Sequence, residues 1–154
     1  MKVLTLLADA AQADAGGKVG ALGLGWTFIP TPAPAYALVI FLDIGPDDTS
    51  SDEYGVRCEL LKDTGEPAML EDHDGPRPLL VEFAGKINLH PPVGGKRFRT
   101  PVVLNMLPGM TLAPGSYRWK VEVVGYEGAV AYEDFDVIGP TPDSDPPEPT
   151  NPAS

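Results

Sequence analysis

Proline and glycine restrict what this chain can fold into more than any other feature of its sequence. Of its 154 residues, 17 are glycine and 18 are proline. Both residue types interrupt long helices, whereas short strands joined by turns accommodate them. Hydrophobic residues make up 43% of the chain, which is enough for an ordinary core. The sequence therefore predicts an all-β domain with many turns.

Apolar patterns predict about eight short strands with frequent turns, as in an antiparallel β-sandwich. Residues 36–44 form an almost continuous apolar run, which is typical of a strand buried on both faces. Residues 54–62 and 117–123 alternate apolar and polar side chains, as half-buried strands do. Pro101 places the strand that contains it at a sheet edge or bulge. Further strands are expected over residues 3–7, 18–29, 79–84, 86–89, 97–106 and 130–138.

The opening segment has the outline of a secretory signal peptide but lacks its length. Lys2 gives a basic start, and the Ala-Asp-Ala sequence at residues 13–15 resembles a cleavage site. The apolar stretch covers only residues 3–8 and contains Thr5, whereas a signal needs roughly 7–15 apolar residues. We therefore expect no signal peptide.

The glycines of the same segment do not match a phosphate-binding loop. Val19 follows Gly17-Lys18, where a Walker loop requires serine or threonine. The later glycines, up to Gly25, run in the reverse of the dinucleotide-binding order, and a β-like stretch that ends at Pro30 follows in place of a helix. Two strands around a turn are the remaining interpretation.

The charge of the chain excludes two classes of partner. It is formally −11, from 11 basic and 22 acidic residues. Phosphate backbones and anionic membrane surfaces repel such a protein, so we expect neither nucleic acid nor a membrane as a partner. The longest apolar run, residues 35–42, is also too short to span a bilayer. Cys58 is the single cysteine, which excludes an intrachain disulfide and a thiolate cluster.

The C-terminal segment, residues 139–154, differs in composition from the rest. It holds six of the 18 prolines and three acidic residues, with no basic residue. A segment without apolar residues to bury cannot offset the entropy of ordering, so we expect a disordered tail. Residues 1–138 then form a single β-sandwich domain.

Short motifs in the opening segment resemble an uncharacterised family of small β-sandwich domains found in bacteria and phages. The motifs are Ala8-Asp9 after the first strand, Gly17-Lys18 at the start of the second, and Leu22-Gly23 within it. The segment LAPGSYRWKVEV, residues 112–123, is similar to the penultimate strand of bacterial immunoglobulin-like sandwiches. The resemblance implies an immunoglobulin-like fold and supplies neither a catalytic residue nor a cofactor.

A cysteine nucleophile is the first chemical hypothesis to weigh. Cys58 could act with His73 or His90 as its base. However, Cys58 shares the inward face of its predicted strand with Tyr54 and Val56, where a free cysteine is usually an inert small hydrophobe. We therefore expect a core cysteine and no catalytic residue.

Acidic residues in two loops raise the hypothesis of a calcium site. If the loops met at one end of the sandwich, their oxygens could bind this hard cation. The spacing matches no known calcium loop, so solvated acidic turns without a metal are the expectation. The residues are Asp43, Asp47, Asp48, Asp52 and Glu53 in one loop and Glu71, Asp72 and Asp74 in the other.

The aromatic residues raise the hypothesis of a sugar-stacking platform, formed from Trp26, Tyr36, Trp119, Tyr126 and Tyr132. Alternation places Trp119 and Tyr117 in the core. Tyr117 is expected to be a corner residue whose hydroxyl bonds the backbone. Tyr126, at the tip of a predicted hairpin, is expected to be the most exposed aromatic.

These observations predict a non-enzymatic structural or protein-interaction module with an unidentified protein partner. The resemblance implies that it is phage-encoded or phage-related, located in the bacterial cytoplasm or on a virion. A calcium- or carbohydrate-binding module is the alternative, and a small hydrolase ranks third. Carboxylate pairs for glycoside hydrolysis carry little information here, because the chain has 22 acidic residues and the chemistry depends on their separation.

Removal of residues 139–154 tests the predicted domain boundary. A chain that ends at Ile138 should keep its melting temperature within about two degrees, because the tail lacks apolar residues to bury. Thermal melts of the full and shortened chains measure this difference. A large drop would show that the tail packs on the domain.

Overall fold

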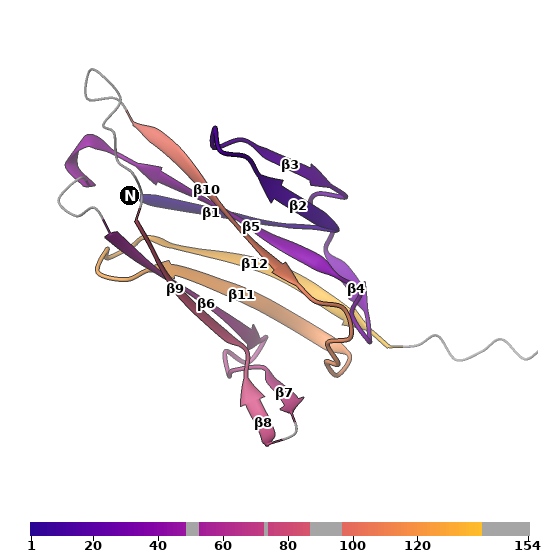
Figure 1. Ribbon diagram of the computed structural model, residues 1–154. Helices are drawn as coiled ribbons and strands as arrows, with labels where there is room; N and C mark the ends of the chain where they lie inside the picture. The colour runs from indigo at the N-terminus through magenta and orange to yellow at the C-terminus, as the bar shows by residue number, and fades with distance from the viewer. Residues whose placement is uncertain (49–52, 73, 87–96, 140–154) are drawn as a thin grey trace, which may run out of the picture.

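The chain forms a two-layered β structure (Figure 1). The computed structural model describes residues 1–48, 53–72, 74–86 and 97–139. A three-stranded and a five-stranded sheet face each other and enclose the core, so the prediction of an all-β sandwich is confirmed. The predicted strand over residues 86–89 and the predicted tail, residues 139–154, lie mostly outside the described residues.

The three-stranded sheet has the order β1-β5-β10 and is antiparallel. Its strands are β1 (Lys2–Ala8), β5 (Tyr36–Ile44) and β10 (Phe98–Met106). Pro101 lies in β10, at the edge that its missing N–H predicted.

The five-stranded sheet has the order β4-β12-β11-β6-β9 and is antiparallel except where the short β4 pairs in parallel with β12. Its β11–β12 hairpin and its alternating strand β6 are confirmed as predicted. The strands are β4 (Phe28–Pro30), β6 (Glu53–Lys62), β9 (Leu80–Lys86), β11 (Gly115–Val123) and β12 (Val130–Ile138).

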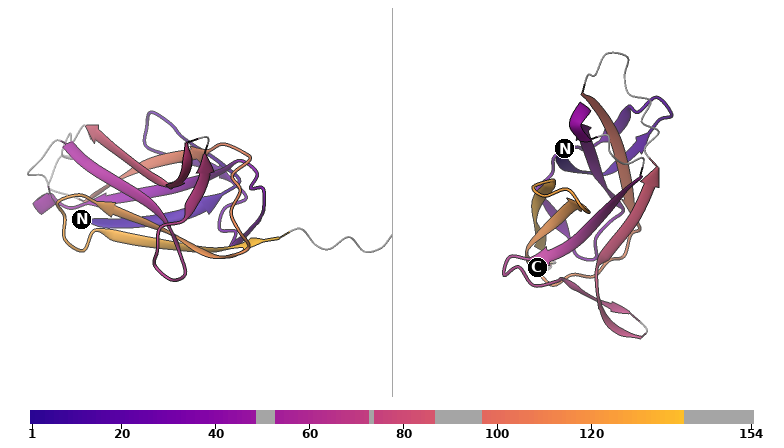
Figure 2. Two further views of the ribbon diagram at one scale, coloured as in Figure 1. Left: turned by 90° about the horizontal axis from the view of Figure 1, so that it is seen from below. Right: turned by 90° about the vertical axis from the view of Figure 1, so that its left-hand side faces the viewer.

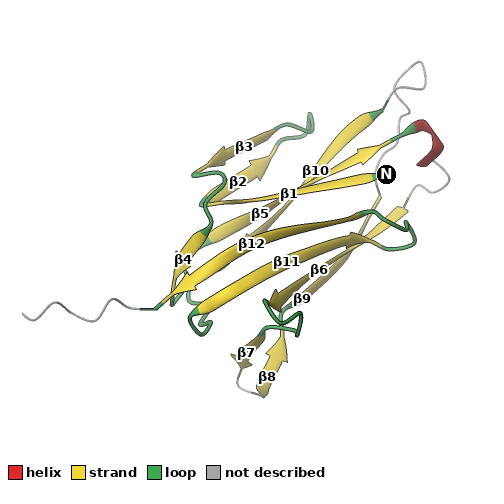
Figure 3. Cartoon of the chain, turned by 180° about the vertical axis from the view of Figure 1, so that it is seen from behind, coloured by secondary structure: helices red, strands yellow, loops and turns green. Residues whose placement is uncertain are grey.

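Two small hairpins and one helical turn complete the described structure (Figure 3). The hairpins are β2 (Ala10–Ala13) with β3 (Val19–Leu22), and β7 (Met69–Asp72) with β8 (Gly75–Pro78). The helical turn is η1 (Pro46–Asp48). The β2–β3 hairpin packs beside β5 and β10 on the outer face of the three-stranded sheet.

Strand β5 is buried on both faces, as its continuous apolar run predicted. Leu38 and Ile40 face the core between the sheets. Ala37 and Val39 alternate with them on the outer face, yet they are also buried. Because β2 lies beside β5, the β2–β3 hairpin covers Ala37 and Val39 on the outer face. The central strand of the small sheet is therefore an interior strand.

Trp119 is the largest fully buried side chain and lies at the centre of β11. Tyr117, Val121 and Val123 share its face, so the predicted alternation is confirmed. The Tyr117 hydroxyl donates to the Ala113 carbonyl oxygen at 2.8 Å, which confirms the predicted corner bond.

The prediction of one long strand over residues 18–29 is wrong. The segment divides into β3 and β4, which belong to different sheets. Gly23 and Gly25 both have positive φ, at 59° and 85°, and turn the chain between the two strands. Trp26 then packs against Tyr36 and Phe135 with edge-on ring contacts.

The prediction that Glu71, Asp72 and Asp74 share an acidic loop is also wrong, because Glu71 and Asp72 lie in β7, which pairs with β8. Two prolines in β8, Pro76 and Pro78, concealed the strand in the sequence. They are tolerated because β8 is an edge strand that pairs only with β7.

Replacement of Trp119 tests this description of the core. Trp119→Ala should lower the free energy of unfolding by about 3–5 kcal/mol, since it leaves a large cavity between the sheets. Urea titration measures the change. Tyr132→Ala is the control, because 51% of that side chain is exposed and its removal should cost far less. Near-native stability of Trp119→Ala would contradict the assignment.

Candidate interaction surfaces

The structure places Cys58 deep in the core. The side chain is fully buried on β6, and burial raises the pKa of its thiol to about 12. A thiol with such a pKa holds no significant thiolate at neutral pH, which is the form that attacks a substrate. His73 and His90, its hypothetical bases, lie outside the described residues.

The hypothesis that the two acidic loops meet is wrong. The first loop, with η1, comes directly before β6, and the β7–β8 hairpin lies at the opposite end of that strand (Figure 1). The length of β6 therefore separates the two groups of carboxylates. Within the described ranges, no group of three or more His, Cys, Asp or Glu side chains could hold a metal ion.

Several of these carboxylates have partners within the protein. The Arg99 guanidinium donates to both oxygens of Asp43, at 2.6 and 2.9 Å, and this bonding lowers the pKa of that carboxyl. The N-terminal ammonium, 2.7 Å from Asp48, lowers the pKa of the Asp48 carboxyl in the same way. Arg77 bonds Asp74 at 2.5 Å.

The placement of the remaining acidic candidates is simpler. Asp47 lies in η1 and is exposed, and Glu53 begins β6. Glu71 and Asp72 belong to β7, although the side chain of Asp72 is outside the described part. Asp52 lies outside the described residues.

The prediction that Tyr126 is the most exposed aromatic is wrong. The tip of the β11–β12 hairpin folds against the loop that contains η1, where the Tyr126 hydroxyl donates to the Asp48 carbonyl oxygen at 3.1 Å. The Tyr54 hydroxyl donates to the same oxygen at 2.6 Å, and the two rings lie 5.3 Å apart. Tyr126 therefore links the tip of the β11–β12 hairpin to the loop that contains η1.

The sugar-platform hypothesis retains one well-exposed candidate. Trp119 and Tyr36 are buried, and Trp26 is half-buried against the core. Tyr132 is 51% exposed on the outer face of the five-stranded sheet. However, the Arg118 guanidinium lies over its ring, 5.3 Å from the centroid, and covers one of the two stacking faces.

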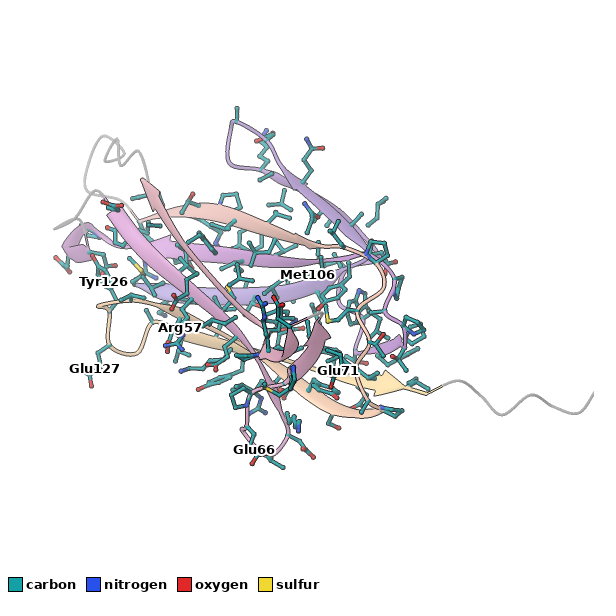
Figure 4. The ribbon with its side chains drawn as sticks, turned by 60° about the horizontal axis from the view of Figure 1, so that its bottom comes forward. Arg57, Glu66, Glu71, Met106, Tyr126 and Glu127 are labelled. Atoms are coloured by element: carbon teal, nitrogen blue, oxygen red, sulfur yellow. The ribbon has the colours of Figure 1, made fainter. Side chains whose placement is uncertain are left out.

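Charged side chains cover much of that outer sheet face and pair with one another. Arg118 forms two hydrogen bonds with Asp134 across the hairpin. Lys120 lies 2.7 Å from Glu122. A trough of about 790 Å³ runs from these residues to the hairpin tip, where it is lined by Arg57, Glu82, Tyr126 and Glu127, among others (Figure 4). Lys120 is therefore paired closely with an acid of the same chain, whereas the Arg57 Nε lies 3.6 Å from Glu82 and 4.0 Å from Glu122.

An apolar groove lies on another side of the molecule, between the β7–β8 hairpin and the segment that links β10 to β11. We call it the Met–Leu groove. It has a volume of about 780 Å³, and Figure 4 labels Met106 and Glu71 at its wall. Glu71 is its one charged lining residue among those described. The apolar lining consists of Leu70, Leu79, Met106, Leu107, Pro108 and Met110.

Leu107 is the most exposed large hydrophobic residue in the described chain, at 83%. The sequence pattern did not predict this exposure, because Met106-Leu107-Pro108-Gly109-Met110 is only an apolar segment around a Pro-Gly turn. The turn follows β10 and lines the groove together with Leu70 and Glu71 of β7, so only the fold shows that Leu107 is accessible.

The Met–Leu groove continues the side of the sandwich that lies between β9 and β10. We call this side the half-open flank. On the opposite flank β1 lies against β12, and Leu7 and Phe135 are buried there. Between β9 and β10 the core-facing side chains Val81, Phe83 and Leu104 are only partly buried. Within the described residues, the core is therefore closed on one flank and only partly covered on the other.

Comparisons with known proteins add no family assignment. No protein-family model matches the sequence, and a search of curated proteins finds no match. The chain is similar to a solved β-glucosidase from Listeria innocua in complex with isofagomine, at 10% identity and a TM-score of 0.40. That alignment covers 90% of this chain and 16% of the glucosidase chain.

Among the described residues, no helix has the length and hydropathy to cross a membrane.

Acidic substitutions at neighbouring positions test the exposure of the Met–Leu groove. Leu107→Asp should change the free energy of unfolding by less than about 0.5 kcal/mol, because the side chain already lies in water. Met106→Asp should cost about 2 kcal/mol or more, since it places a carboxylate against the core. Urea titration of both variants gives the comparison. Equal losses of unfolding free energy in the two variants would contradict the described exposure of Leu107 and burial of Met106.

Proposed function

We propose that the protein is a non-enzymatic structural or protein-interaction module and that the Met–Leu groove contacts its partner. The observation that carries this proposal is Leu107, 83% exposed beside a groove of about 780 Å³. Soluble proteins seldom leave a large apolar side chain exposed next to an apolar groove unless another molecule covers it.

The composition of the groove indicates which kind of ligand would fit. Met106 and Met110 have flexible, polarisable side chains that adapt to ligands of different shape. Its polar lining side chains among those described are Glu71, Asn105 and Thr111, and the apolar ones outnumber them. Apolar side chains of a protein partner match such a lining better than a sugar does.

The finer parts of this proposal draw on both the structure and the sequence. The order of the strands and the Tyr117 corner bond support an immunoglobulin-like arrangement. The opening motifs support a phage-encoded or phage-related origin, with the protein in the bacterial cytoplasm or on a virion. The alternative prediction is calcium or carbohydrate binding. Its carbohydrate part keeps Tyr132 as an exposed aromatic, whereas the separation of the two acidic loops removes the support for calcium.

Site-specific photo-crosslinking tests the proposed function. A photoreactive residue at position 107, in cells that naturally produce the protein, should form one discrete adduct with a partner protein. The same residue at position 22 is the matched control, because Leu22 is also highly exposed, at 73%, but lies on the β2–β3 hairpin away from the groove. Equal adducts at both positions, or none at position 107, would contradict the proposal.

A further inference from the structure

The two main sheets end in four edge strands, and three of these edges are blocked. Strand β1 lies against β12, which closes its side of the sandwich. Strand β10 contains Pro101, and Gly17 of the β2–β3 turn lies next to this proline. Strand β4 is three residues long and ends at Pro30. Proline and short length are usual ways to prevent a sheet edge from pairing with another chain.

Strand β9 lacks these protections in the described structure. It forms the border of the five-stranded sheet beyond β6 (Figure 2), and its residues 80–86 contain no proline. Four of its first five residues are apolar. An edge of this kind is a template for strand addition.

The hydrogen bonds at the start of β9 show which backbone groups face outward. The Leu79 carbonyl oxygen accepts from the Leu60 amide of β6 at 3.0 Å. Residues of an antiparallel pair alternate between those that bond the neighbouring strand and those that do not. Val81 and Phe83 therefore bond β6, and the N–H and C=O groups of Leu80, Glu82 and Ala84 point to the free edge.

The side chains around this edge favour a particular pattern in an added strand. Its inward side chains would continue the row of Val81 and Phe83 and would cover the half-open flank towards Leu104. Its outward side chains would lie beside Glu82, which is 63% exposed. The Arg57 Nε lies at a loose 3.6 Å from a carboxylate oxygen of Glu82, so this carboxylate can accept a second partner.

Charge distinguishes between two possible occupants of the edge. Two copies of this chain could pair through β9, but each copy carries a formal charge of −11 and they would repel each other. A basic segment of another protein is attracted by the same charge. The charge complementarity therefore favours a basic partner over a second copy.

We propose that β9 binds an extended segment of a partner protein by strand addition, and that this segment alternates apolar and basic residues. The apolar residues enter the half-open flank, and a lysine or arginine pairs with Glu82. This inference rests on the proposed function, of which it specifies the partner. The bound strand would lead towards the Met–Leu groove, because Leu79 lies both beside β9 and in the groove wall.

Peptide titration with the full chain tests strand addition. The probe is a capped peptide of alternating valine and lysine that is long enough to span β9. Its control has the same sequence with alternate backbone amides methylated, which keeps the charge but removes hydrogen bonds along one edge. At about 0.15 M salt, where long-range attraction is screened, the unmethylated peptide should bind at least about tenfold more tightly. Its binding should shift the amide resonances of Leu80, Glu82 and Ala84.

Two substitutions at position 82 distinguish the contribution of the backbone N–H to peptide binding from the contribution of the side-chain charge. Glu82→Pro removes an outward N–H without breaking a bond to β6 and should weaken peptide binding about tenfold or more. Glu82→Gln keeps the N–H and should weaken it by at most about fivefold. Circular dichroism verifies that both variants fold, and the methylated peptide tests the proposal on the unaltered protein.

Each negative result overturns a different statement. Equal binding of the methylated peptide, or equal effects of the two Glu82 substitutions, would overturn strand addition. Shifts restricted to Leu107 and Met110 would also overturn it, while they would leave the groove as the interaction site. Concentration-dependent dimerisation that Glu82→Pro abolishes would replace the basic partner with a second copy. Loss of the cross-link at position 107 would overturn the proposed function itself.

Discussion

The burial of β5 on both faces is the constraint on which the rest of the structure depends. Leu38 and Ile40 on one face form the core with Trp119 of the opposite sheet. Ala37 and Val39 on the other face are covered by the β2–β3 hairpin. Both edges of β5 are paired, with β1 and β10. The small sheet stops at three strands because β1 lies against β12 and β10 contains Pro101.

The different sizes of the two sheets explain why one flank of the sandwich is uncovered. On one side, β1 reaches β12 and closes the core around Leu7 and Phe135. On the other side, β9 and β10 do not pair with each other, so core-facing residues of both strands are only half-buried. The Met–Leu groove and the free edge of β9 are parts of this same flank. The proposed partner would supply the cover that the chain itself lacks in the described structure.

Local pattern was sufficient to predict most of the strands. The apolar run of β5, the alternation of β6 and β11, and the Tyr117 corner are all properties of short segments, and all are confirmed. The division of residues 18–29 between two sheets was not predictable, because glycines carry no pattern of burial. The Met–Leu groove was not predictable either, since β7 and the segment after β10 meet only in the fold. Tyr126 was mispredicted because its partner, the Asp48 carbonyl, is a long-range backbone group.

The central claim is that β9 presents an unpaired edge on an uncovered flank. Amide hydrogen exchange of the free protein, resolved by residue, tests this claim most directly. Amides that bond β6 are protected, whereas outward amides exchange with water. The account predicts alternation along the strand, with slow exchange at Val81 and Phe83 and fast exchange at Glu82 and Ala84. Uniform slow exchange across these four residues would show that the edge is already covered and would contradict the account.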